Sequence, residues 1–155
     1  MKKVLYLLAF TLLSFTSMSK VVDFSGTWNL NKSKSTLNDQ FSMAPSQMIL
    51  MQTPDSLNLQ KQVNIQGQDV TIKDKLTLDG KECINDGWEG TMKKSNIGWS
   101  ADEMLMTITT NLPLPDGTHM TIIETYQMEG EQLKLVSGAS SSFGDFTETY
   151  LFDKQ

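Results

Sequence analysis

The sequence predicts an all-β protein, an antiparallel meander of about 8–10 strands that closes into a barrel. Apolar and polar residues alternate with a period of two along most of the chain after residue 20, which is typical of strands with one buried face. Turn residues, chiefly glycine, aspartate and proline, separate these segments at short intervals. We favour a barrel because closure removes the exposed edges of an open sheet, and a two-sheet β-sandwich is the alternative.

Nine segments carry this alternation. They are 24–30, 46–53, 56–65, 69–78, 91–100, 103–111, 118–128, 132–139 and 146–153. The polar stretch 31–45 is predicted to form a loop or a short helical lid, and 80–90 a less regular connection. No internal repeat or linker interrupts residues 20–155, so they are predicted to form a single domain.

The register of the hairpin between 56–65 and 69–78 is predicted from its turn. A two-residue turn at 67–68 pairs Ile65 with Val70, and every other apolar residue on that face then meets an apolar partner. A slip of one residue would set apolar residues against polar ones. The same register sets Lys61 directly opposite Asp74, and we expect these two charges to form a cross-strand ion pair.

Two further hairpins follow from turn residues. A turn at 101–102 pairs Trp99 with Met104, and Ile97 with Met106. A turn at 129–131 joins the strand that ends near residue 128 to the next strand.

Several polar residues fall in the apolar register. Glu124 shares a face with Ile122 and Tyr126, and Glu148 shares one with Tyr150. A few polar groups in an apolar lining are the usual form of a ligand pocket, whereas the plainer alternative places them near a barrel mouth, where water reaches them. The candidate ligand-binding residues are Lys61, Asp74, Glu124, Tyr126 and Glu148.

Composition excludes several classes of function. The formal net charge is −5 and the chain has no arginine, which argues against nucleic acid or an anionic membrane as a partner. Cys83 is the sole cysteine, so no intramolecular disulfide forms. His119, the sole histidine, lies on the outward register, and no metal-binding spacing or nucleophilic triad occurs. We therefore predict no catalytic residue, metal or cofactor, and no enzyme activity.

The first residues predict export. Lys2 and Lys3 precede an apolar run at 4–15, and small residues then suit cleavage of a signal peptide after Ser19. The run is shorter than the ~20 residues that span a membrane. A lipid anchor would need a cysteine at the cleavage site, and the residue there is Lys20. The expected product is a monomer of residues 20–155 in the periplasm or the extracellular space, and its formal net charge is −7 once the two leading lysines are removed.

The segment Gly26-Thr27-Trp28 resembles the Gly-x-Trp motif that opens the first strand of lipocalins and related calycin barrels. More loosely, the chain resembles a group of secreted bacterial lipocalin-like proteins, mostly of unassigned function. The similar parts are 26–28, 33–35, Trp99 with 102–105, 129–133 and 150–155.

The resemblance implies that a small molecule binds inside the barrel. It also implies structural roles for Gly26 and Trp28, and we expect Trp28 to plug the closed end of the barrel. Lipocalins usually pack a late arginine across this tryptophan. Here Lys134 or Lys154 is the candidate replacement, through a cation–π contact.

The sequence is compatible with two candidate functions. The first is binding or carriage of a small, mostly apolar ligand in the barrel interior. The alternative is a protein-interaction or inhibitor module that acts through the loops at 31–45 and 112–117.

Overall fold

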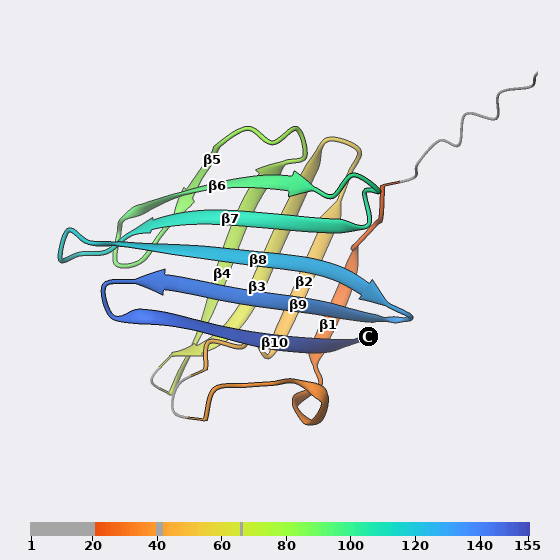
Figure 1. Cartoon of the computed structure of the whole chain (residues 1–155), viewed down its shortest axis with the longest axis horizontal. Coiled ribbons are helices and arrows are strands. Elements are labelled where there is room, and N and C mark those ends of the chain that lie inside the picture. The colour runs from red at the N-terminus through yellow and green to blue at the C-terminus, as the bar shows by residue number, and fades with distance from the viewer. Residues whose placement is uncertain (1–20, 40–41, 66) are drawn as a thin grey trace, which may run out of the picture.

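The computed structural model describes residues 21–39, 42–65 and 67–155, and these form ten strands (Figure 1). The strands are β1 (Gly26–Leu30), β2 (Gln47–Gln52), β3 (Ser56–Ile65), β4 (Gln68–Thr77), β5 (Cys83–Asp86), β6 (Met92–Trp99), β7 (Leu105–Pro113), β8 (His119–Glu129), β9 (Gln132–Ser141) and β10 (Gly144–Lys154). One short 3₁₀ helix, η1 (Lys32–Lys34), lies in the β1–β2 connection. Among the described residues, no helix has the length and apolar character needed to cross a bilayer.

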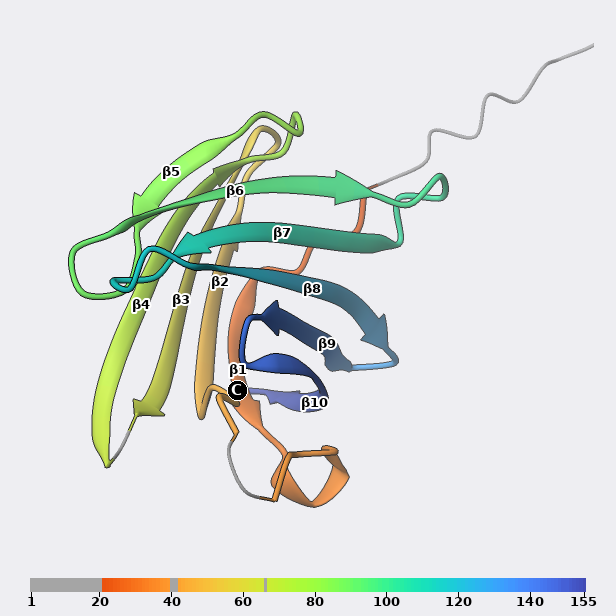
Figure 2. The ribbon, with the colours of Figure 1, turned by 60° about the vertical axis from the view of Figure 1, so that its left-hand side comes forward.

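The strands form one antiparallel sheet whose order is β4-β3-β2-β1-β10-β9-β8-β7-β6-β5. Each strand except β4 pairs with the next along the chain, and β1 also pairs with β10. In Figure 2 the sheet curls so that β1–β4 form one wall and β6–β10 run across them as the other. This arrangement confirms the predicted meander and makes the protein a lipocalin-like β-barrel.

The two edge strands, β4 and β5, are joined by side chains. The Asn85 side chain donates to the Lys75 carbonyl oxygen (3.1 Å) and accepts from the Lys75 backbone N–H (2.9 Å). Nearer the end of β4, the Thr77 backbone N–H donates to Cys83 Sγ (3.3 Å). Side-chain groups thus replace the backbone hydrogen bonds of a ladder along the junction of β4 and β5, which we call the seam. The prediction that 80–90 is an irregular connection was wrong at β5, which is short and supplies these groups.

The predicted register of the β3–β4 hairpin was wrong by two residues. Ile65 pairs with Gln68, and Lys61 therefore lies opposite Ile72 instead of Asp74. The turn lies between Ile65 and Gln68, and Gly67 within it has a φ of +85°, a value that favours glycine. A slip of two residues keeps every side chain on the same face of the sheet. Alternation therefore identifies the buried face without identifying the cross-strand partner.

The β6–β7 hairpin shows the same kind of difference. Trp99 pairs with Met106 instead of Met104, because the loop is longer than predicted. The Ser100 backbone N–H donates to the Leu105 carbonyl oxygen, and the Asp102 carboxylate accepts from the Ser100 hydroxyl. In the β8–β9 hairpin, by contrast, the predicted turn at 129–131 is confirmed.

A continuous apolar core fills the end of the barrel where Trp28 lies. Trp28 is 1% exposed, and its indole N–H donates to the Phe24 carbonyl oxygen (3.0 Å). The ammonium group of Lys154 lies 5.3 Å from the Trp28 ring centroid, whereas Lys134 pairs with Glu129 (2.7 Å). Trp28 is therefore part of the buried core, and Lys154 supplies the cation. We call this end the base; its other core residues include Met48, Leu50, Leu57, Leu59, Met106, Leu133, Leu135 and Phe152.

Candidate functional site: a charged band beneath an apolar mouth

All five candidate residues lie on inward-facing positions of their strands. The side chains of Lys61, Asp74 and Glu124 are 12%, 11% and 13% exposed. Glu148 is 1% exposed and Tyr126 is fully buried. The structure brings them together as a belt of polar groups next to the base, which we call the charged band; Lys93, Ser95, Thr110 and Tyr150 complete it.

The pair Lys61–Glu124 crosses the barrel interior. Lys61 projects from β3 and Glu124 from β8, which are five steps apart in the sheet order. The Tyr126 hydroxyl donates to the second Glu124 oxygen (3.2 Å). The predicted partner of Lys61 was Asp74, and that prediction was wrong because the register places Ile72 there. The lysine instead reaches the opposite wall, so this ion pair crosses the interior between the base and the space beyond it. We call the Lys61–Glu124 pair the strut.

Asp74 pairs with Lys93 of β6, a residue that the sequence analysis missed. The Lys93 ammonium nitrogen lies 2.8 Å and 2.9 Å from the two carboxylate oxygens, so this pair also ties β4 to β6 beside the seam. In the described part of the chain, Asp74 Oδ1 receives no well-aligned hydrogen bond despite the short distance. Alternation could have found Lys93, because it shares its strand face with Ile97 and Trp99.

Glu148 is held by neutral donors. One carboxylate oxygen accepts from the Asn38 backbone N–H (2.7 Å), and the other accepts from the Tyr150 hydroxyl (2.6 Å). An isolated bridge between Thr36 and Thr149 attaches the same connection to β10. In its described residues, 31–39 and 42–45, this connection is a loop with one helical turn, within the prediction, and Glu148 holds Asn38 against the barrel wall.

The two band tyrosines remain protonated far above their usual range. Burial raises the pKa of Tyr126, and the carboxylate of Glu124 raises it further. Burial likewise raises the pKa of Tyr150, with the Glu148 carboxylate as the second cause. Both hydroxyls therefore serve as hydrogen-bond donors to carboxylates.

These tyrosines predict a measurable alkaline transition. A chain that starts at Lys20 lacks Tyr6, so its tyrosinate absorbance reports on Tyr126 and Tyr150 alone. The unfolded chain releases these protons near pH ~10, so stability is present below that pH and is lost as pH rises toward the folded pKa values. We expect tyrosinate absorbance to appear together with loss of near-ultraviolet circular dichroism. Ionisation of either tyrosine in the folded protein at pH ~10 would contradict this account of the band.

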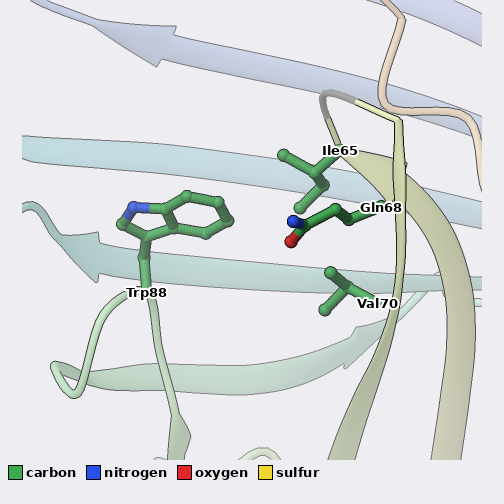
Figure 3. A pocket seen from close by; sticks show the side chains of 4 residues that line it. All are labelled: Ile65, Gln68, Val70 and Trp88. Atoms are coloured by element: carbon green, nitrogen blue, oxygen red, sulfur yellow. The ribbon is translucent and has the colours of Figure 1, made fainter.

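Beyond the charged band, the strands continue into a partly open apolar region. Ile65 and Val70 lie near the β3–β4 turn, and Trp88 of the β5–β6 loop is 40% exposed. With Gln68 they line a pocket of 220 Å³, and Figure 3 shows the Trp88 ring facing the other three side chains. We call this end the mouth; its inward-facing apolar residues also include Ile72, Met120, Ile122 and Phe146. Sequence reasoning missed Trp88, because it lies in a loop without alternation.

Other candidate chemistry finds little support in the described residues. Residues 21–39, 42–65 and 67–155 contain no group of three or more histidine, cysteine, aspartate or glutamate side chains that could hold a metal ion. His119 is exposed at the start of β8. Cys83 is a partly buried free thiol within the seam.

Comparison with known proteins identifies the fold. No protein-family model and no curated protein matches the chain. Among solved structures, the apo form of lipid binding protein 8 from Caenorhabditis elegans is similar, with a TM-score of 0.53 and 9% identity over 85% of this chain and 95% of that one. Zebrafish ileal bile acid-binding protein, complexed with cholic acid, has a TM-score of 0.52 and 15% identity over 85% of this chain and 98% of that one. At these identities the likeness shows the fold, a calycin-type barrel, and does not identify a ligand.

Proposed function

We propose that this protein binds a small, mostly apolar ligand in the mouth of its barrel. The observation that carries the proposal is the division of the interior into a filled base, a charged band and an open apolar mouth. Apolar side chains around a concavity, with a few polar groups at its floor, are the usual composition of a ligand site. The two similar solved barrels support this reading, since one is a lipid binding protein and the other holds cholic acid.

The size of the pocket limits the ligand. Its 220 Å³ is below the ~300–1,000 Å³ of sites for drug-sized molecules. A single alkyl chain or a small ring is therefore a better fit than a bulky polycyclic molecule. The Trp88 ring and the branched side chains opposite it would contact such an apolar body.

A charge placed in the mouth is expected to abolish this binding. Ile65→Glu would put a carboxylate against the apolar part of the ligand, and we expect at least about a tenfold loss of affinity for decanol. Ile84→Glu makes the same change on the exposed outer face of β5, where Ile84 is 60% exposed, and should leave the affinity unchanged. Isothermal titration calorimetry measures both. Equal affinities of the two variants, or no decanol binding by the unaltered protein, would contradict the proposal.

We also propose that the protein acts after export, as residues 20–155. The support is the sequence of residues 1–19, which lies outside the described residues. The intact mass of the protein from its own host is expected to correspond to a chain that begins at Lys20. A mass that retains residues 1–19 would contradict this proposal.

A further inference from the structure

We infer that the ligand of the mouth carries a primary ammonium group, which binds at the carboxylates of the charged band. This inference rests on the proposed function, since it concerns the polar end of the same ligand. It follows from the charge balance of the band, from its hydrogen-bonding capacity and from the position of two glutamates.

The charged band has more negative than positive groups. Among the described residues it contains the lysines Lys61 and Lys93 and the acids Asp74, Glu124 and Glu148. Each lysine already pairs with one acid, and the donors to Glu148 within residues 21–39, 42–65 and 67–155 are neutral, an N–H and a hydroxyl. The band therefore has a formal charge of −1 before a ligand enters. A cationic head balances this charge, whereas a carboxylate head would add a second uncompensated charge to a poorly hydrated site.

The hydrogen-bonding capacity of the band points the same way. An ionised carboxylate offers about four acceptor sites. Glu124 accepts from Lys61 and Tyr126, Glu148 accepts from two donors, and Asp74 Oδ1 has no well-aligned donor within the described ranges. Both tyrosine hydroxyls are already directed at carboxylates. The carboxylates therefore have unused acceptor sites, which a ligand that donates hydrogen bonds can fill.

The two glutamates lie in one row on the barrel wall. Ser137 of β9 pairs with Glu124 on one side and with Glu148 on the other. Two strand spacings place the glutamate backbones about 10 Å apart. Glu124 is the partly exposed member, so it is the carboxylate that an incoming head meets first, and Glu148 supplies the uncompensated charge behind it.

The same row determines how the ligand is oriented. Ile122 and Phe146 are the next inward residues toward the mouth on the strands of Glu124 and Glu148. An ammonium group at Glu124 therefore places an attached alkyl chain along these side chains, toward Ile65 and Trp88. A primary ammonium fits better than a trimethylammonium, because only the former donates hydrogen bonds to the unused acceptors.

The test compares decylamine, decanol, decanoate and decyltrimethylammonium by calorimetry at neutral pH and physiological salt. At an effective dielectric constant of ~20, one charge at about 10 Å changes affinity by about tenfold. We expect decylamine to bind about tenfold more tightly than decanol, and decanoate and decyltrimethylammonium to bind more weakly than decylamine. If decanol binds but decylamine gains nothing over it, or if decanoate binds most tightly, the inference is overturned and the proposed function stands. If none of the four binds, both fail.

A matched pair of variants distinguishes a ligand preference caused by the charged band from one caused by the acidic surface. Glu148→Gln removes the uncompensated charge, and the ratio of decylamine to decanol affinity should fall from about tenfold to near one. Glu131→Gln makes the same change at an exposed position in the β8–β9 turn and should leave the ratio at its original value. An equal fall in both variants would attribute the preference to overall charge and overturn the inference. If Glu148→Gln does not fold, the series on the unaltered protein still decides it.

Discussion

Lys61→Met is expected to lower the free energy of unfolding by about 3–5 kcal/mol, because it leaves the Glu124 carboxylate buried with Tyr126 as its one remaining donor among the described residues. The lysine and glutamate side chains are 12% and 13% exposed, so water compensates little of the loss. Urea unfolding followed by tryptophan fluorescence measures the change.

Two comparisons identify the cause of this loss. The double variant Lys61→Met/Glu124→Met removes both charges, and most of the lost stability should return because methionine fills a similar volume. Lys81→Met removes one partner of the exposed pair with Asp79 and should leave stability nearly unchanged. If Lys61→Met and Lys81→Met have the same effect, the strut across the interior does not exist.

Trp28→Ala is expected to lower the free energy of unfolding by about 3–5 kcal/mol. The substitution removes the largest side chain of the base and leaves the Phe24 carbonyl oxygen without its indole donor. The surrounding side chains come from strands on both walls of the barrel, so they cannot collapse into the space without moving the backbone.

Trp88→Ala provides the matched control for this prediction. Trp88 is 40% exposed in the mouth, so its loss should change stability little and should weaken decanol binding. The two tryptophans should therefore have opposite roles, one in stability and the other in binding. A stability loss from Trp88→Ala as large as that from Trp28→Ala would contradict the division into base and mouth.

The sequence predicts which residues face inward better than it predicts their partners. Lys61, Asp74, Glu124 and Glu148 were placed on the inner face from alternation, and they lie there. The expected pair of Lys61 with Asp74 was wrong, because moving the hairpin register by two residues leaves alternation unchanged. Only the length of the turn after Ile65 decides between the two registers, and Gly67 lies in both candidate turns.

Features that depend on barrel closure could not be predicted. The Lys61–Glu124 contact joins residues 63 positions apart on opposite walls, so it requires the curvature of the whole sheet. The seam likewise depends on β5, which is too short to show a clear alternation. Trp88 and Asn38 act from loops, where residue type carries no periodic signal.

Methyl-resolved NMR during a decanol titration tests the division of the interior most directly. The methyl signals of Ile65, Val70 and Ile122 in the mouth are expected to shift as decanol is added. The signals of Leu57 and Leu133 in the base should stay in place, since these leucines are fully buried in the filled core. Shifts centred on the base leucines, or no shift at any mouth residue with saturating decanol, would contradict the account.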